Sequence, residues 1–538
     1  MSLLAEKSPT KSQAPIDCLR LLALNHFLIN NNFQTLILVS ANKRLHLAIK
    51  NLCNGLNISF TGQKIYNKLT NVTFNKLWNS IPLILQSPIY LLRYIILKWP
   101  LRKIRKYDWI NQQNSLCIIS YFDNLHESFF NRGEFYSLYW TKLPDLLKRY
   151  DININWMHHY IKSHLAPNPF IASKYTETIN HNSQKKEIHK YFESFLTLEI
   201  IVKTILQWIK LTFRIFLLSP EKTILKHNKS WLWSILKKEW KNSILGPVAI
   251  QNLLWLNLFD RAIKSLPKQK MALYLCENQG WERALIHSWK KHGHGCLIGV
   301  AHSTVRYWDL RYFDDPNVFD SNKSLAQPLP DYIAVNGPEA MNIYKNAKQP
   351  KNRLLEVEAL RYLHLGSVKS NEINGNKGYL KSTEWGKLLI LGDILPSTTH
   401  SMLKTLEMGA DLFKFQSLTI KSHPNNMIKV ENFPKLNLLT TNQPLNKLLS
   451  NYDMVIASIY TSAGLEAYCA GLRVLTFLDK NDFNFSPLRN QSGTSYFSNI
   501  DQFMEVMNSK NIANPRINNY FHLDNELPRW EKLIEKYY

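Results

Sequence analysis

The sequence predicts an α/β protein of two domains, each built around a parallel sheet that faces a shared cleft. Short apolar runs of strand length alternate with helical stretches of about ten residues or more, which is typical of strand–helix–strand units in parallel sheets. A polar, glycine-bearing stretch at residues 366–384 interrupts this alternation and is typical of a linker. At 538 residues, the chain is long enough for a separate hydrophobic core on each side of that linker.

The amino-terminal domain is expected at residues 1–365. One predicted helix, Trp281–Lys291, separates two of its predicted strands. The apolar runs that predict strands in this domain are Thr35–Val39, Cys117–Tyr121, Met271–Leu275, Cys296–Val300 and Tyr332–Val335.

Residues 74–243 depart from this plan and predict a helical insert that is both basic and apolar. Leu77–Leu92 has no charged residue, but it is shorter than the roughly twenty residues that span a bilayer, and basic residues follow it. Leu196–Leu218 places Lys203, Lys210 and Arg214 on one helical stripe. Such helices suit the surface of an anionic bilayer, and core helices with a solvated stripe are the alternative.

The carboxy-terminal domain is expected at residues 385–538. Helices are expected at about 398–414, 444–451 and 462–470, and a closing helix at Pro528–Tyr538 is expected to pack back across the domain junction. Its predicted strands are Lys387–Leu391, Leu418–Lys421, Leu436–Thr440, Met454–Ala457 and Arg473–Leu478.

The formal net charge of +25 fits three kinds of partner: nucleic acid, an anionic membrane or an acidic substrate. A coding bias toward Asn, Lys and Ile is a competing cause of this charge. The six cysteines form no CxxC pair, so neither a zinc site nor a disulfide framework is predicted. The first sixteen residues lack the apolar core of a signal peptide, and we expect a cytoplasmic protein that needs no metal or cofactor.

Two polar motifs in the carboxy-terminal domain predict a phosphate site. Lys421, His423 and Pro424 follow one predicted strand, and Ser458 ends another. Because both motifs lie where a strand gives way to a loop and helix, they belong to the ligand-binding edge of a parallel sheet. His423 can donate to a phosphate oxygen, and Lys421 adds positive charge.

The second motif continues into a predicted helix. Thr461 and Ser462 lie where that helix begins, so their hydroxyls and the free backbone N–H groups offer donors to an anion. Simple helix capping is the alternative, but it accounts for only one hydroxyl. Glu466 follows one turn later, within reach of ribose hydroxyls or a base edge.

The amino-terminal domain has its own polar cluster after two predicted strands. A carboxylate there can deprotonate an acceptor hydroxyl, and Glu277 is the first candidate, followed by Glu282, Asp309 and Asp123. The remaining candidates, expected to bind substrate, are Asn278, His302, Arg306 and Arg311, the two arginines because the guanidinium matches a carboxylate. Ion pairs of Glu282 with Arg283 and of Asp309 with Arg311 are the structural alternative.

The motifs resemble those of known carbohydrate enzymes. Lys421-x-His423-Pro424, followed by Ser458-x3-Ser462-x3-Glu466, resembles the CMP-binding half of bacterial sialyl-, polysialyl- and Kdo-transferases, which are two-domain GT-B enzymes with Rossmann-like domains. The run CENQGWERAL, followed by GVAHSTVRYWDLRYF, resembles bacterial surface-carbohydrate (O-antigen) biosynthesis proteins. Together these resemblances cover roughly residues 270–480, and they imply that His423, Ser458 and Ser462 hold the nucleotide phosphate.

The chain departs from the transferases at one point. Their base often lies in an acidic-acidic-Gly motif, which Glu277-Asn-Gln-Gly280 only approximates. The function expected from the resemblance is transfer of a CMP-activated ulosonic acid, such as Kdo or a sialic-type sugar, to a lipid-linked glycan at the cytoplasmic face of the inner membrane.

Three alternatives remain: a GT-B enzyme using a UDP- or GDP-sugar, a non-catalytic polysaccharide assembly protein, and a nucleic-acid binder. The sequence has no P-loop, GxGxxG or DxD motif, which disfavours nucleotide hydrolysis, dinucleotide redox chemistry and metal-assisted sugar transfer of the single-domain type. It also has no RNP, KH or zinc-finger pattern, so we expect no nucleic-acid partner.

Overall fold

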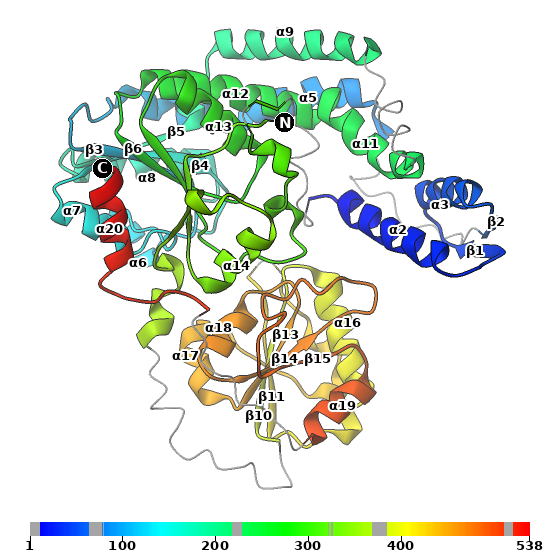
Figure 1. Cartoon of the computed structure of the whole chain (residues 1–538). Helices are drawn as coiled ribbons and strands as arrows, with labels where there is room; N and C mark the ends of the chain where they lie inside the picture. Colours follow the sequence, from blue (N-terminus) through cyan, green and yellow to red (C-terminus); the bar gives the residue numbers. More distant parts are fainter. Residues whose placement is uncertain are drawn as a thin grey trace.

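The computed structural model describes residues 11–63, 78, 80–217, 229–320, 322–323, 326–367, 385–424, 426–509 and 520–538. Most of the predicted linker at 366–384 therefore lies outside the described residues, as does Leu77. The described chain forms two α/β domains, one above the other in Figure 1.

The amino-terminal domain contains a parallel sheet of seven strands in the order β5-β4-β3-β6-β7-β8-β9. The order runs outward in both directions from β3 and β6, so the chain reverses its direction of growth between these two strands. This is the doubly wound order of a Rossmann fold, in which ligands bind at the reversal point. The strands are β3 (Ser115–Phe122), β4 (Asn153–Tyr160), β5 (Glu187–Tyr191), β6 (Met271–Leu275), β7 (Cys296–Val300), β8 (Tyr332–Val335) and β9 (Leu354–Glu356).

The prediction that residues 74–243 form a helical insert is wrong, because β3, β4 and β5 lie inside that range. β4 and β5 were not predicted from the sequence because they carry His, Asn, Lys and Glu in place of an apolar run. Three of these polar side chains are fully buried and hydrogen-bonded: Asn155 bonds the backbone of Ile110, and the rings of His158 and His189 are hydrogen-bonded at 3.0 Å.

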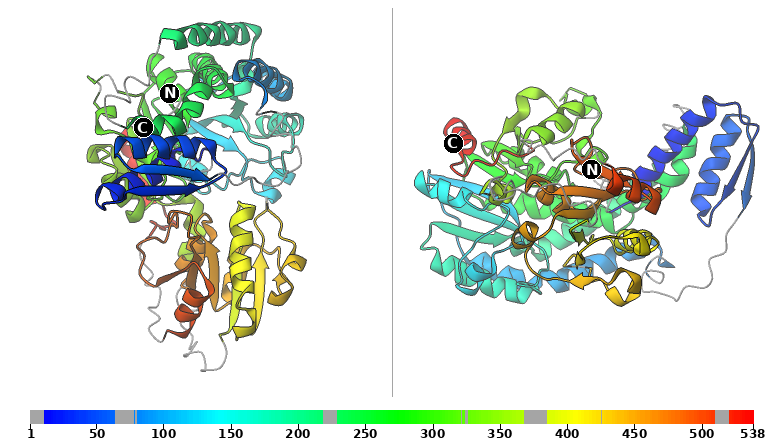
Figure 2. Two further views of the ribbon diagram at one scale, coloured as in Figure 1. Left: turned by 90° about the vertical axis from the view of Figure 1, so that its right-hand side faces the viewer. Right: turned by 90° about the horizontal axis from the view of Figure 1, so that it is seen from below.

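The apolar run Thr35–Val39 is a strand, but it does not belong to the main sheet as predicted. This strand, β1, pairs in parallel only with β2 (Ser59–Gln63), among the described residues. Together with α2 (Ala14–Ile29) and α3 (Lys43–Gly55) they form a small unit beside the amino-terminal domain (Figures 1 and 2). Its burial alternates along β1, as expected for a sheet covered on one face.

The carboxy-terminal domain contains a six-stranded parallel sheet in the order β12-β11-β10-β13-β14-β15, which has its reversal point between β10 and β13. Four predicted strands are found, β12 is shorter than predicted, and β15 was not predicted. The strands are β10 (Lys387–Leu391), β11 (Ser417–Lys421), β12 (Leu439–Thr440), β13 (Met454–Ser458), β14 (Arg473–Phe477) and β15 (Thr494–Phe497). The predicted fold class, two Rossmann-like domains, is thus confirmed.

The chain crosses back to the amino-terminal domain at its end. Helix α20 (Pro528–Tyr537) packs Trp530 into the core of that domain, beside Leu116 and Leu273. The Trp530 indole donates to the backbone oxygen of Glu358, and the Glu358 carboxylate accepts from the Arg529 side chain at 3.1 Å. The predicted closing helix is therefore present and anchors the two domains.

Three helices cover one face of the amino-terminal domain: α5 (Leu83–Lys98), α9 (Leu198–Arg214) and α12 (Pro247–Ser265) (Figure 1). Leu91, Ile200 and Leu254 from these helices share one buried cluster. Within the described ranges, no helix is long and apolar enough to cross a membrane.

Candidate active site at the domain junction

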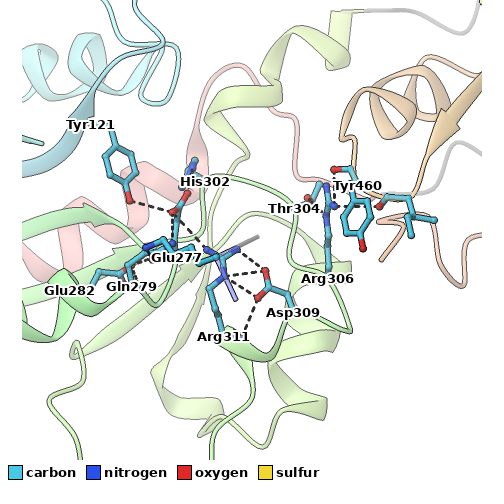
Figure 3. A network of polar contacts seen from close by, with 12 residues as sticks. Tyr121, Glu277, Gln279, Glu282, His302, Thr304, Arg306, Asp309, Arg311 and Tyr460 are labelled. Atoms are coloured by element: carbon cyan, nitrogen blue, oxygen red, sulfur yellow. Dashed lines mark hydrogen bonds and ion pairs between the residues drawn. The ribbon is translucent and has the colours of Figure 1, made fainter. Parts of the chain in front are cut away.

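The carboxyl ends of the two sheets meet at the domain junction. Arg306, which follows β7, donates to the backbone oxygen of Tyr460 at 2.9 Å and to that of Ile459 at 3.4 Å, both of which follow β13. A second contact joins His364 to Glu466 at 3.7 Å. Figure 3 shows Arg306 beside the loop that carries Tyr460. The loops that carry most of the predicted site residues therefore lie on facing edges.

Two candidate bases flank the reversal point of the amino-terminal sheet, because Asp123 follows β3 and Glu277 follows β6. The Asp123 Oδ2 atom lies 3.5 Å from the hydroxyl of Tyr139, and its Oδ1 atom is buried with no hydrogen-bond partner. Burial raises the pKa of Asp123 to about 6, although the Tyr139 hydroxyl and the Arg361 charge oppose this shift. A carboxylate with a pKa near neutral suits general base catalysis.

Glu277 lies at the centre of a denser network (Figure 3). Its carboxylate accepts from Tyr121 at 3.2 Å and Gln279 at 3.3 Å, and lies 3.5 Å from His302 and 3.8 Å from Arg311. Burial alone would raise the pKa of Glu277, but the neighbouring His302 imidazole, the Arg311 charge and the two donors outweigh it and hold the pKa below its usual value. Glu277 is therefore ionised at neutral pH and a weaker base than Asp123.

His302 follows β7 and is buried beside the Tyr139 ring, with ring centroids 5.0 Å apart. Its Nε2 atom faces Glu277, and its Nδ1 atom is buried with no hydrogen-bond partner. Burial lowers the pKa of His302 to about 4, and the nearby Glu277 carboxylate only partly opposes this. The imidazole beside the candidate bases is therefore uncharged at physiological pH.

Glu282 hydrogen-bonds to the backbone of its own loop. Its Oε1 atom accepts from the backbone N–H groups of Glu277 at 2.9 Å and Gln279 at 2.8 Å, where α13 (Gly280–Lys291) begins. This is a capping box, and the carboxylate is buried. Burial raises its pKa to about 7 against these two hydrogen bonds. Glu282 thus holds the loop that carries Glu277.

Asp309 and Arg311 form the ion pair that the sequence left as an alternative. The guanidinium donates to both carboxylate oxygens, with Nη2–Oδ2 at 2.6 Å and Nε–Oδ1 at 2.9 Å. Arg283, by contrast, lies near Asp314 at 3.8 Å and donates to the backbone oxygen of Pro328. Asn278 adopts a left-handed backbone conformation with φ of 56° in the loop after β6.

The reversal point of the carboxy-terminal sheet is occupied by a carboxylate that the sequence analysis did not identify. Asp393 follows β10 and is fully buried, where its Oδ2 atom accepts from the hydroxyl of Ser458 at the end of β13. Its Oδ1 atom accepts from the backbone of Leu395, and its backbone oxygen accepts from Asn426. The Ser458 hydroxyl is thus held by Asp393.

His423 lies two residues beyond the end of β11 and is half-buried. Burial lowers its pKa, and the Asp393 charge opposes that shift. Ser458 bonds to Asp393 and His423 is close enough to feel its charge, whereas Lys421 donates to the backbone oxygen of Gln443 at 2.7 Å. Pro424 is exposed.

The remaining predicted phosphate ligands lie at the start of α18 (Ala463–Cys469). Thr461 accepts from the backbone of Ala463 at 3.2 Å, whereas Ser462 makes no side-chain capping bond. Glu466 projects from this short helix toward His364 of the amino-terminal domain.

Asp393 could have been identified from the sequence, because it follows an apolar run as the other site residues do. Arg361 could not: it lies in the 3₁₀ helix Leu360–Ser367, far in sequence from any motif, and its guanidinium is 5.8 Å from the Tyr139 ring centroid. Its positive charge favours the ionised form of Asp123, and the charges of Glu466 and Asp123 in turn help to raise the pKa of Arg361. It therefore lies between the two domains' acidic side chains.

A cavity of about 370 Å³ opens at the junction. Arg306 and Lys345 line it from one domain, and Ser486 and Arg489 from the other. The Arg489 guanidinium lies 4.3 Å from the centroid of the Tyr307 ring, and its Nη1 atom is buried with no hydrogen-bond partner. In the described part of the chain, no cluster of three or more potential metal ligands occurs.

The sequence matches no protein-family model and no curated protein. Distant structural similarity is found to a glycotransferase of kitacinnamycin (13% identity, TM-score 0.40, 79% of this chain and 99% of that one) and to UDP-GlcNAc 2-epimerase from Neisseria meningitidis (8%, 0.41, 78% and 98%). MurG of Acinetobacter baumannii is a third case (11%, 0.36, 73% and 89%). At such identities and TM-scores the likeness supports no inference about reaction or substrate.

Proposed function

We propose that the protein is a glycosyltransferase of surface-polysaccharide biosynthesis, which transfers a CMP-activated ulosonic acid to a lipid-linked glycan. One observation supports this most strongly. The reversal points of both sheets, where Rossmann-like folds bind ligands, carry polar clusters, and hydrogen bonds join the two edges across the junction. A donor on one edge and an acceptor on the other would meet there.

In this proposal Asp123 removes the proton from the acceptor hydroxyl. The acceptor oxygen then forms a bond to the anomeric carbon of the donor sugar, and the bond from that carbon to the phosphate oxygen breaks. Asp123 is favoured over Glu277 as the base because its pKa is raised to about 6 and its Oδ1 atom lacks a partner. Glu277, with His302 and Arg311, holds the acceptor-side loop in place.

The nucleotide would bind at the carboxy-terminal reversal point. His423 donates a hydrogen bond to the leaving phosphate, helped by Ser462 and the backbone N–H groups of the following turn. Asp393 orients Ser458 and favours the charged form of His423. The preference for CMP rests on the resemblance of the two motifs to CMP-sugar transferases.

A UDP- or GDP-sugar is the second candidate. Glu466 is compatible with it, because this carboxylate projects from α18 toward the other domain, where it could accept from ribose hydroxyls of any nucleotide. The Glu466 side chain is 21% exposed and lies 3.7 Å from the His364 ring.

The test measures the melting temperature of the full-length protein with CMP, UDP and GDP, and sugar release from CMP-Kdo and CMP-sialic acid. We expect CMP to raise the melting temperature most and His423→Ala to abolish release while the protein stays folded. A clear UDP preference would move the donor to the second candidate. Full activity of His423→Ala would show that the phosphate lies elsewhere.

A further inference from the structure

Helix α5 exposes a continuous apolar face to solvent. Leu85, Ile89, Leu92 and Ile96 recur at spacings of three or four residues, so they lie on one side of the helix. Their exposed fractions are 53%, 45%, 60% and 64%. Side chains of this kind usually lie singly on a surface, and a continuous row marks an interaction site.

Helix α9 exposes a second apolar face of the same kind. Leu198, Val202, Leu206 and Phe213 follow the helix from end to end and are 72%, 55%, 61% and 69% exposed. Leu217, just beyond the helix, is 84% exposed. The opposite side of α9 packs on α12 through Ile200 and Thr204, so the exposed row is the outward side.

The two helices lie side by side. Ser87 of α5 and Trp208 of α9 donate to the same backbone oxygen, that of Leu245, at 2.7 Å and 3.2 Å. Both helices also pack on α12, and Figure 1 shows them at the end of the molecule opposite the carboxy-terminal domain. The two exposed rows are together named here the α5–α9 face.

Basic residues accompany this face. From residue 83 to residue 106 the sequence has six basic residues and no acidic one. Lys103 and Arg105, in the 3₁₀ helix Trp99–Lys106 that continues α5, are exposed. On α9, Lys210 and Arg214 are exposed, and Glu199 is the only acidic residue of that helix. An apolar strip bordered by positive charge matches the interface of an anionic bilayer.

We infer that the α5–α9 face docks the protein on the surface of an anionic lipid bilayer. The apolar rows enter the headgroup–acyl boundary while the basic residues contact anionic headgroups. A second copy of the chain is a poorer occupant, because it would bring the same basic border against itself in a protein whose net charge is +25. This inference does not depend on the proposed reaction.

The test is co-sedimentation of the full-length protein with two vesicle types, phosphatidylcholine alone and phosphatidylcholine with phosphatidylglycerol. The wild type should bind the anionic vesicles, more weakly as NaCl increases. The double variant Leu206→Glu/Phe213→Glu should bind at least about tenfold more weakly, since each glutamate would have to enter the interface.

The matched control is Met408→Glu/Leu412→Glu, which adds the same charge at positions 79% and 54% exposed in the other domain. It should bind like the wild type. The charge variant Lys210→Gln/Arg214→Gln should lose binding to anionic vesicles selectively. Unchanged melting temperatures would show that all variants fold.

Three results would overturn the inference. One is wild-type protein that stays in the supernatant with anionic vesicles. Another is equal binding to both vesicle types, which would remove the role of the anionic lipid. The third is a wild-type dimer in light scattering that Leu206→Glu/Phe213→Glu converts to a monomer, which would show that a second copy covers the face.

Discussion

Arg306 of the amino-terminal domain donates a 2.9 Å hydrogen bond to the backbone oxygen of Tyr460 in the carboxy-terminal domain. The same guanidinium lies 3.3 Å from the Thr304 hydroxyl, so its position is fixed from its own domain. Arg306 was expected to bind a substrate carboxylate. In the structure its donors instead hold the turn after β13 against the loop after β7.

Replacing Arg306 with alanine should loosen the domain junction. The buried carbonyl oxygens of Ile459 and Tyr460 would lose a charged donor, at a cost of about 1–3 kcal/mol. Urea unfolding measures this loss. The exposed Arg44→Ala on α3 serves as the control and should change stability by no more than about 0.5 kcal/mol.

The identity of the base can be determined from pH dependence. If Asp123 is the base, turnover should rise with pH through about 6 and then level off, because the carboxyl group must lose its proton to act. Asp123→Asn should abolish turnover. A rate that stays constant well below pH 5, and that is lost in Glu277→Gln, would assign the base to Glu277 instead, since its pKa is lowered.

His302 should make stability fall in acid. Burial lowers its pKa to about 4, below the value near 6.5 of an unfolded histidine, so the unfolded chain binds the proton more readily. The resulting contribution is complete above about pH 6.5 and is lost as pH falls toward 4. The difference in the free energy of unfolding between pH 7 and pH 5 should be smaller in His302→Phe than in the wild type.

Glu282 should tolerate an amide but not a truncation. Glutamine keeps an oxygen acceptor for the backbone N–H groups of Glu277 and Gln279, whereas alanine leaves both without a partner. We expect Glu282→Ala to lose about 1–2 kcal/mol and Glu282→Gln much less, as measured by denaturant unfolding. Equal losses in the two variants would contradict the capping role.

Gly337 is required by a close backbone approach. A Cβ atom there would lie 2.2 Å from the backbone oxygen of Tyr520, in the segment that returns to the amino-terminal domain. Gly337→Ala should therefore destabilise the fold by about 1–3 kcal/mol. Gly55→Ala is the control, because a Cβ atom at Gly55 has no neighbour within 4 Å.

The parts of the fold that sequence could predict are the strands whose residues are uniformly apolar. β6, β7, β10 and β13 were found this way because both of their faces are buried. β4 was missed because it buries two polar side chains, Asn155 and His158, whose hydrogen-bond partners Ile110 and His189 are distant in sequence. β1 was assigned to the wrong sheet, since an apolar run does not specify its pairing partner.

The site was predictable where a polar residue directly follows such a strand. This rule placed His423 and Glu277 at facing sheet edges, and it would also have identified Asp393. It could not show that Arg306 bonds a backbone carbonyl or that the charge of Arg361 acts on Asp123, because these interactions join segments distant in sequence.

The most direct test is a crystal structure of the protein with CMP. If the nucleotide binds at the carboxy-terminal reversal point, its phosphate will lie within hydrogen-bond distance of the His423 imidazole and the turn that carries Ser462. A phosphate bound away from His423, or CMP bound only to the amino-terminal domain, would contradict the account.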